Sequence, residues 1–243
     1  MFDYDNPQLI SAYTEMTEKM GLWESEKYLI TKYFKVDGTT LDVGCGAGRI
    51  SFALSKMEFK NIYGVDIAPE MIHAAFRMAK KMNLDEGKLK LLKICNQGIC
   101  NFHSTIEFDN CMFSYNGLWG IKTQQRKIAL LNILKLLKND GIFIFTSHID
   151  YNVNPNYRKF WKEKRNLWER QGLPIDDSFS DLLVEDKGVG VYQHFSTDNE
   201  VYDLITGIGF KVIFTALRNE ICKENNYVKS MTNNCRFWVC HKT

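Results

Sequence analysis

The sequence has almost no excess of charge of either sign. Its 243 residues include 31 lysines and arginines against 29 aspartates and glutamates, so the formal net charge is +2. Such a balance lacks the basic footprint of a nucleic-acid-binding protein. With 45% hydrophobic residues, the chain also lies outside the regime of intrinsic disorder. We therefore expect a folded protein, and the charge balance disfavours a nucleic-acid partner.

Segments that would carry the chain into or across a membrane are missing as well. The first residues are acidic and polar, and no basic start leads into an apolar run, so the sequence shows no signal peptide. The most apolar helical stretch, residues 128–137, is interrupted by Asn132 and Lys135 and is too short to span a bilayer. We expect a cytoplasmic protein without a membrane partner.

The seven cysteines form no C-x-x-C pair. Cys95 and Cys100 are five residues apart, as are Cys235 and Cys240. In an extended strand an odd separation places side chains on opposite faces, so disulfide or zinc pairing within these pairs is geometrically poor. An odd number of cysteines without a secretion signal indicates reduced thiols, and no residue spacing predicts a metal site.

Strand-forming runs alternate with runs of helical period, a pattern that produces a parallel sheet covered by helices. Strands are predicted at residues 39–43, 61–65, 88–95, 108–114, 142–146, 210–216 and 235–241, and helices at 49–56, from Pro69 to Met82 and at 123–137. Thr197 with Glu200 three residues later has the pattern of a capping box. It predicts a last helix that ends at Gly207 and Gly209.

Two segments lie outside this alternation. Residues 1–37 are predicted to be helical, and residues 150–195 separate the fifth strand from the last helix. In an open α/β sheet, ligands bind beyond the carboxyl ends of the strands, which both segments adjoin. We therefore predict an N-terminal lid over 1–37, a ligand-binding domain formed by 38–149 and 196–243, and a substrate cap formed by 150–195.

A glycine-rich turn follows the first strand. It has the sequence Gly44-Cys45-Gly46-Ala47-Gly48-Arg49 and opens a helix, and glycines there let a ligand approach the backbone closely. The dinucleotide fingerprint G-x-G-x-x-G would need glycine where Arg49 stands, which disfavours a nicotinamide-dependent oxidoreductase. Asp66 ends the second strand, where an acid can accept hydrogen bonds from a ribose. The pocket thus suits a nucleoside with little or no phosphate.

At these residues the chain resembles the class I S-adenosylmethionine-dependent methyltransferases. The resemblance rests on Leu-Asp-Val-Gly-Cys-Gly-Ala-Gly at 41–48, Gly-Val-Asp-Ile-Ala-Pro-Glu-Met-Ile at 64–72, Phe-Asp at 108–109 and Leu-Leu-Lys-Asn-Asp-Gly at 136–141. It implies a Rossmann-like, doubly wound α/β fold whose mainly parallel, seven-stranded sheet has an antiparallel last strand. It also implies S-adenosylmethionine as cofactor and S-adenosylhomocysteine as product. The run at 136–141 departs from the usual Leu-Lys-Pro-Gly-Gly, which affects a turn and not the site.

The resemblance also implies a set of cofactor contacts. Gly44 and Gly46 would meet the methionine part, and Asp42 would support the turn or bind the ammonium group. Asp66 would hold the ribose hydroxyls. Ile67 would pack against adenine, and an amide after the third strand would replace the more usual Asp. The full predicted set is Asp42, Gly44, Cys45, Gly46, Asp66, Ile67, Met71, Asn96, Gln97 and Ser114, the last of these near the reacting methyl.

The acceptor site is expected where the fourth strand ends, at residues 113–119. This run lacks the Asn/Asp-Pro-Pro-Tyr/Phe motif of DNA-amino and glutamine methyltransferases and the Pro-Cys nucleophile of cytosine-C5 enzymes. It is similar to the Gly-Asn-Ser stretch of glycine N-methyltransferase-like enzymes, with Asn116 at the amide that meets substrate. His148 follows the fifth strand and is the best candidate for a proton acceptor or a substrate ligand. The predicted catalytic residues are His148, Tyr115 and Asn116, and the predicted substrate contacts are Trp23, Asn116, Trp119 and His194.

Because the sulfonium methyl is already electrophilic, its transfer depends mainly on alignment and the exclusion of water. We predict transfer to nitrogen or oxygen of a small metabolite, by a monomer or a homodimer. Two alternatives stay open: an RNA methyltransferase, and a non-catalytic sensor or scaffold that binds S-adenosylmethionine. Residues 157–168 mix bases with aromatics and could clamp RNA. Their aromatic residues recur at helical spacing, however, which favours an amphipathic lid helix.

Overall fold

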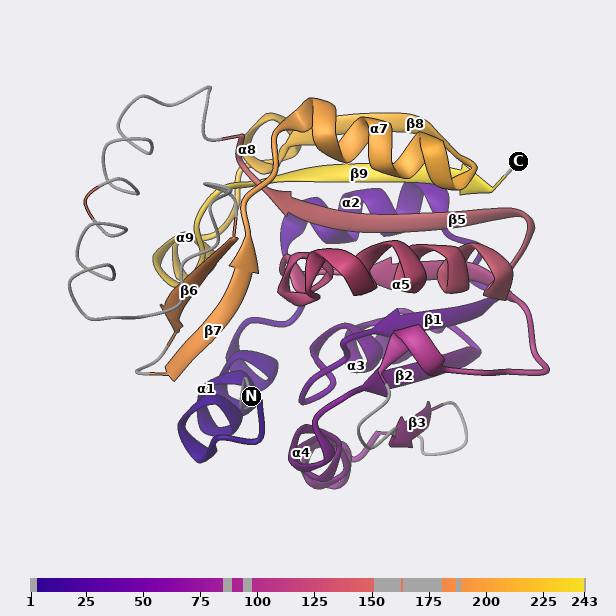
Figure 1. The fold of residues 1–243 in the computed structure, drawn as a ribbon. Coiled ribbons are helices and arrows are strands. Elements are labelled where there is room, and N and C mark those ends of the chain that lie inside the picture. Colours follow the sequence, from indigo (N-terminus) through magenta and orange to yellow (C-terminus); the bar gives the residue numbers. More distant parts are fainter. Residues whose placement is uncertain are drawn as a thin grey trace.

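A seven-stranded sheet runs through the part of the chain that the computed structural model describes, residues 4–84, 89–93, 98–150, 163, 181–186 and 189–242. The strand order is β3-β2-β1-β4-β5-β9-β8 (Figure 1). These strands are β1 (Thr39–Val43), β2 (Asn61–Asp66), β3 (Leu89–Lys93), β4 (Phe108–Phe113), β5 (Leu137–His148), β8 (Phe210–Leu217) and β9 (Cys235–Lys242). Neighbours from β3 to β5 pair in parallel, and β9 is antiparallel to both β5 and β8. The predicted sheet is confirmed.

Helices cover both faces of this sheet. α5 (Thr123–Leu136) and α7 (Asp198–Ile208) lie on one face, and α2 (Glu24–Tyr33) and α3 (Arg49–Lys56) lie on the other (Figure 1). The other helices are α1 (Pro7–Lys19), α4 (Pro69–Lys81), the short α8 (Arg218–Ile221) and α9 (Asn226–Met231), and the 3₁₀ turns η1 (Ile99–Asn101) and η2 (Gly117–Gly120). Within the described ranges, no helix combines the length and the apolar character that crossing a membrane requires.

The sheet separates two hydrophobic clusters, because successive residues of a strand face opposite sides. In β9, Trp238 and Cys240 belong to the cluster under α5 and α7, whereas Phe237 and Val239 belong to the cluster under α2 and α3. Cys235 is buried in the second cluster, so Cys235 and Cys240 lie on opposite faces as their spacing predicts. The cysteines in the described ranges are free thiols.

The N-terminal helices pack at two different places. α2 contributes Leu29 and Ile30 to the cluster under α2 and α3, and both side chains are fully buried. α1 begins after Asn6, whose side chain accepts a hydrogen bond from the Gln8 N–H at 2.9 Å, and it runs beside α4. Its Glu18 pairs with a lysine of α4 at 2.7 Å. α1 therefore rests on the surface of the sheet domain, and α2 is part of its interior.

A separate antiparallel hairpin is formed by β6 (Asp181–Asp186) and β7 (Val189–His194). It belongs to the segment predicted as a substrate cap, most of which lies outside the described residues. Val191 of β7 packs with Leu9 of α1 and Met71 of α4. The hairpin and α1 therefore meet beyond the carboxyl ends of the parallel strands. The division of the chain into lid, domain and cap stays a prediction.

The structure departs from the predicted elements at three places. β5 begins at Leu137 rather than at residue 142, because Leu137 already pairs with Phe108 of β4. The predicted turn forms an irregularity within the strand, where Asp140 has a φ of +63°. Helices α8 and α9 fill the connection between β8 and β9, and both are too short to show a helical period in the sequence. Thr197 accepts the Glu200 N–H at 3.1 Å, but the Glu200 carboxylate lies 2.7 Å from His194 Nε2. The Glu200 carboxylate therefore contacts His194. In the predicted capping box it would instead accept the backbone N–H of Thr197.

Candidate active site

The glycine-rich turn lies at the carboxyl end of β1, where the strand order reverses between β1 and β4. Gly44, Gly46 and Gly48 have φ angles of +64°, +52° and +94°, in a region that residues with a Cβ rarely adopt. A Cβ on Gly44 would lie 2.8 Å from the Phe113 ring, whereas one on Gly46 would meet only Tyr13, at 4.0 Å. The turn therefore requires glycine, and it leaves space above Gly46.

Asp66 lies at the carboxyl end of β2, directly beside this turn. One carboxylate oxygen accepts the Gly46 N–H at 2.8 Å, and the other accepts the Ala68 N–H at 2.9 Å. Burial raises the pKa of Asp66 above its ordinary value, and these backbone hydrogen bonds oppose that shift. The carboxylate thus fixes the turn and the start of α4 together, and it lies where the sequence predicts a ribose contact.

Asp42 of β1 is almost completely buried and supports the first turn of α3. Its Oδ2 accepts hydrogen bonds from the Ser51 N–H at 3.1 Å and from the Ser51 hydroxyl at 2.7 Å. Burial raises the pKa of Asp42 to about 7 despite these bonds and the nearby Arg49 charge. Of the two roles that the sequence allows for Asp42, these contacts favour support of the turn.

Asp42→Asn is expected to change how stability depends on pH. An unfolded carboxyl ionises near pH 4 and the buried one near pH 7, so wild-type protein loses stability as the pH rises between these values. The amide keeps an acceptor for Ser51 and does not titrate. Two pKa units correspond to about 3 kcal/mol, so the variant should gain on the order of 3 kcal/mol over wild type between pH 5 and pH 8.

Urea unfolding at several pH values measures that gain. Asp37→Asn is a suitable control, because the Asp37 side chain is 81% exposed at the opposite end of β1. A gain for Asp42→Asn that does not vary with pH would contradict burial of the charge as the cause.

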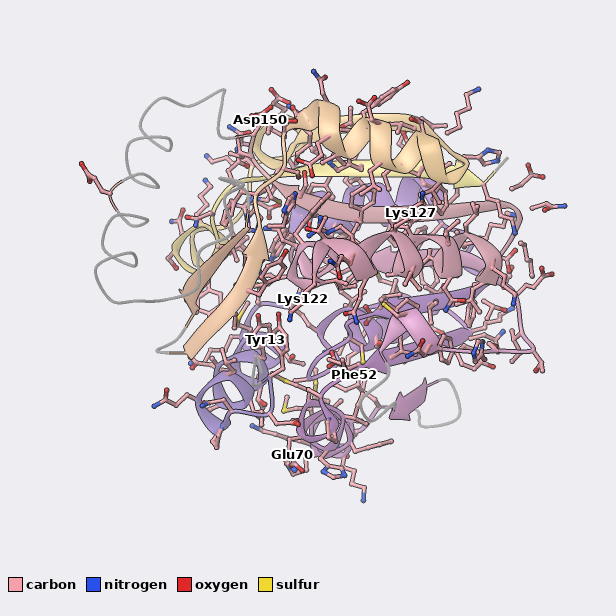
Figure 2. The ribbon with its side chains drawn as sticks, in the orientation of Figure 1. Tyr13, Phe52, Glu70, Lys122, Lys127 and Asp150 are labelled. Carbon is pink, nitrogen blue, oxygen red and sulfur yellow. The ribbon has the colours of Figure 1, made fainter. Side chains whose placement is uncertain are left out.

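A small pocket opens above the turn. Within the described residues it is lined by Tyr13, Met16 and Thr17 of α1, and by Asp42, Gly44, Cys45, Gly46, Ala47, Arg49, Ile50, Ser114 and Tyr115. Figure 2 marks Tyr13 on α1 and Phe52 on α3, the helix that follows the turn. The N-terminal helix therefore covers the turn and forms one wall of the pocket.

The β2 side of the site offers an apolar surface. The Ile67 side chain, directly after Asp66, is 47% exposed. A Cβ on Gly98 would lie 3.5 Å from Ile67 Cδ1, so the chain after β3 passes close to this side chain. Asn96 and Gln97 lie outside the described residues. Met71, also in the predicted cofactor set, is buried against α1 and β7.

A buried ion pair lies next to the pocket, and no pattern in the sequence predicts it. The Glu26 carboxylate of α2 pairs with the Arg49 guanidinium at 2.6 and 2.8 Å and accepts the Ser114 hydroxyl. Ser114 thus lines the pocket, and its hydroxyl is engaged by Glu26. Arg49 entered the sequence argument only as the residue that breaks the dinucleotide fingerprint. No local pattern links Glu26 to it, because the two residues belong to different helices.

Of the predicted catalytic residues, Asn116 and His148 meet where β4 and β5 end, whereas the Tyr115 ring packs beside Tyr13 and Trp23. Tyr115 and Asn116 follow β4 with φ angles of +55° and +58°. Asn116 Nδ2 lies 3.2 Å from His148 Nδ1, and His148 Nε2 lies 3.0 Å from Gln193 Oε1. Burial lowers the pKa of His148 to about 4, so the imidazole is neutral at pH 7. Its Nδ1 then accepts from Asn116, and its Nε2–H donates to Gln193.

Three predicted substrate contacts are instead packed inside the protein. Trp23 is 2% exposed and Trp119 is fully buried, with its indole N–H donated to the Thr146 carbonyl at 2.9 Å. His194 is 4% exposed and stacks on Trp119, with ring centroids 5.7 Å apart. Packing in the interior explains why large rings stand at these three positions, and it leaves them no exposed surface for a substrate. Their aromatic rings fill gaps between elements that are distant in sequence.

The fold and the site together define a class of protein. A doubly wound sheet carries a glycine-rich turn, an acid on the neighbouring strand and an exposed apolar side chain beside it, an arrangement that fits adenosine without a phosphate. A family model described as a methyltransferase domain matches residues 34–233. The chain belongs to this family and is a class I S-adenosylmethionine-dependent methyltransferase.

Similar proteins include relatives from several organisms. An uncharacterized protein of Methanocaldococcus jannaschii is 27% identical over 213 residues, which cover 86% of this chain and 75% of that protein. Human EEF1A lysine methyltransferase 2 is 29% identical over 117 residues, 46% of this chain and 48% of that protein.

Solved structures share the fold over nearly the whole chain. A SAM-dependent methyltransferase from Methanosarcina mazei has a TM-score of 0.69 at 18% identity, covering 92% of this chain and 99% of that one. Magnesium protoporphyrin IX methyltransferase from Synechocystis, with bound S-adenosylhomocysteine, has a TM-score of 0.65 at 14% identity, covering 99% and 97%. At such identities the likeness concerns the fold.

Proposed function

We propose that this methyltransferase transfers the methyl group to nitrogen or oxygen of a small metabolite, which binds where β4 and β5 end. The observation that carries the proposal is the linked row of Asn116, His148 and Gln193. Phe195 stacks on His148 with ring centroids 4.2 Å apart, so the row is covered from the side of β7. A polar row enclosed in this way suits a compact acceptor better than an extended polymer.

Asn116 favours nitrogen as the accepting atom. Its Oδ1 is buried and has no hydrogen-bond partner among the described residues. A buried acceptor without a partner costs about 1–3 kcal/mol, and an acceptor molecule that supplies an N–H would remove this cost. An amine can donate that hydrogen and still direct its lone pair at the methyl group, whereas a hydroxyl must also lose a proton.

The backbone conformation of Tyr115 and Asn116 also supports a functional site at the end of β4. Tyr115 and Asn116 are consecutive residues in the left-handed region, which costs of order 1–3 kcal/mol for each. Such strain concentrates at functional sites, where the rest of the fold enforces it. The Asn116 N–H is held by the Thr146 hydroxyl at 2.8 Å, so β5 fixes the strained residue in place.

For the methyl donor we propose that Asp66 holds the ribose hydroxyls and that Ile67 packs against adenine. Gly44 and Gly46 then contact the methionine part. The exposed Ile67 side chain and the open space above Gly46 support this orientation. The donor would supply an electrophilic methyl group, and the protein would exclude water and align the acceptor.

A methyl-release assay tests the proposal. Purified protein is incubated with S-adenosylmethionine and either a metabolite library or a dialysed protein fraction, and S-adenosylhomocysteine is measured. Product formation with a metabolite is the expected result. The similarity to a human lysine methyltransferase makes a protein acceptor the second candidate, and turnover only with the protein fraction would favour it. Tight donor binding without any product would favour a sensor, and turnover only with added RNA would favour an RNA methyltransferase.

His148→Ala is expected to lower kcat for the identified acceptor by up to about 10²-fold, because the imidazole holds Asn116 and the loss of an aligning contact can cost a factor of this size. Its affinity for S-adenosylmethionine should stay within about twofold, because His148 contacts Asn116 and Gln193 and does not line the donor pocket. Steady-state kinetics and calorimetry separate these effects.

His241→Ala is the matched control, because its imidazole lies 3.2 Å from Asp140 at the far end of β5. Equal kcat values for the two histidine variants would remove His148 from the mechanism.

A further inference from the structure

The Glu26 carboxylate is the most completely satisfied charged group in the described part of the site. It is fully buried on α2 and accepts the Trp23 N–H at 2.8 Å. It also accepts both terminal nitrogens of Arg49, at 2.6 and 2.8 Å, and the Ser114 hydroxyl. Four donors from three segments therefore converge on one side chain.

Two of these partners are walls of the donor pocket. Arg49 is the first residue of α3 after the glycine-rich turn, and Ser114 directly follows β4. Arg49 also donates to the Gly21 carbonyl at 2.8 Å, between α1 and α2. Glu26 thus joins the turn, the end of β4 and the N-terminal helices. Without it, the Arg49 guanidinium would lose its ion-pair partner at the pocket wall.

The proposed adenosine contacts and the proposed acceptor row together indicate where the sulfonium of S-adenosylmethionine would lie. The adenosine contacts proposed above lie on the β2 side, at Asp66, and the acceptor row begins at Asn116. A donor bound in the proposed orientation would bring its cationic sulfur to the pocket wall that Ser114 and Arg49 form. A like charge at that wall would repel a sulfonium, and the low dielectric of a buried pocket strengthens such repulsion.

We infer that Glu26 is a positioning residue for the methyl donor. It neutralises Arg49 next to the sulfonium, and through Arg49 and Ser114 it fixes the pocket wall. Glu26 therefore lets the pocket bind a cation beside an arginine. The inference uses the proposed donor orientation and is independent of the nature of the acceptor.

S-adenosylmethionine carries the sulfonium charge and S-adenosylhomocysteine does not, so their affinities separate an electrostatic role from a merely structural one. Glu26→Gln keeps the shape and one acceptor oxygen but leaves Arg49 uncompensated. Calorimetry should show at least a tenfold loss of affinity for S-adenosylmethionine and less than a threefold loss for S-adenosylhomocysteine. Equal losses, or no loss, would overturn the inference.

The double variant Glu26→Gln/Arg49→Gln provides a test in which no charge is left unpaired, so it remains usable if the single variant does not fold. Burying an unpaired charge is strongly destabilising, whereas removing both partners is often neutral. We expect the affinities for S-adenosylmethionine and S-adenosylhomocysteine each to fall at least threefold, because the pocket wall is no longer anchored. The ratio of the S-adenosylmethionine affinity to the S-adenosylhomocysteine affinity should stay within threefold of the wild-type ratio. Wild-type affinities for both molecules, or a ratio still tenfold lower, would contradict the inference.

The result does not depend on the acceptor. Both measurements use binding alone, so failure of the metabolite screen leaves them unaffected. A failure of the affinity test, in turn, leaves the proposed acceptor site in place.

Discussion

Gly48→Ala is expected to destabilise the native protein by about 2–5 kcal/mol. Gly48 has a φ of +94°, and a residue with a Cβ pays about 1–2 kcal/mol in the left-handed region. The added Cβ would also lie 2.4 Å from the Phe52 ring, which is 1% exposed and has no free space to enter. Overpacking of this kind costs about 1–3 kcal/mol more. Equilibrium unfolding in urea measures the sum.

Gly207→Ala is the control for this substitution. Gly207 lies inside α7, and a Cβ there would meet no atom within 4 Å. Alanine is the better helix former by about 1 kcal/mol, so this variant should be slightly more stable than wild type. If the two alanine variants had the same stability, neither the backbone conformation nor the Phe52 contact of Gly48 would matter.

Asp66→Ala is expected to weaken binding of S-adenosylmethionine by at least tenfold, which corresponds to about 1.4 kcal/mol. Two effects contribute. The carboxylate proposed to hold the ribose is removed, and the Gly46 N–H loses the acceptor that fixes the glycine-rich turn. Calorimetric titration with S-adenosylmethionine gives the change directly, and circular dichroism shows whether the variant is folded.

The exposed Asp37→Ala provides the comparison for Asp66→Ala, since Asp37 pairs only with a surface lysine among its described contacts. It should bind the donor as wild type does. An Asp66→Ala protein that is folded and binds with unchanged affinity would disprove the ribose assignment and the role of the turn together.

The sequence predicts the first half of the sheet well, because the turn residues that end its strands and begin its helices are recognisable locally. The bounds of β1 and α3 agree with the prediction, since the glycine-rich turn between them can form only where glycine permits positive φ. Asp66 is placed beside that turn by the rule that parallel strands end at one edge. The same rule brings Asn116 and His148 together, although 32 residues separate them.

What the sequence does not show depends on contacts between distant elements. The pairing of Glu26 with Arg49 requires that α2 pack against the start of α3, and no residue pattern states this. The sequence predicts Trp23 and Trp119 at the substrate wall, yet both side chains fill the interior. A large aromatic side chain at the start of a helix or turn has the same local pattern whether it faces a substrate or the interior, and only the surrounding packing decides between these two places.

The place of β9 in the sheet has a consequence for how the chain is made. β9 lies between β5 and β8 and pairs with both, although residues 235–242 are synthesised after both neighbours. A nascent chain that has left the ribosome only as far as residue 234 therefore holds two strands with unpaired edges, which can associate with other chains. Truncations that remove residues 235–242 would leave these edges unpaired permanently and should be avoided.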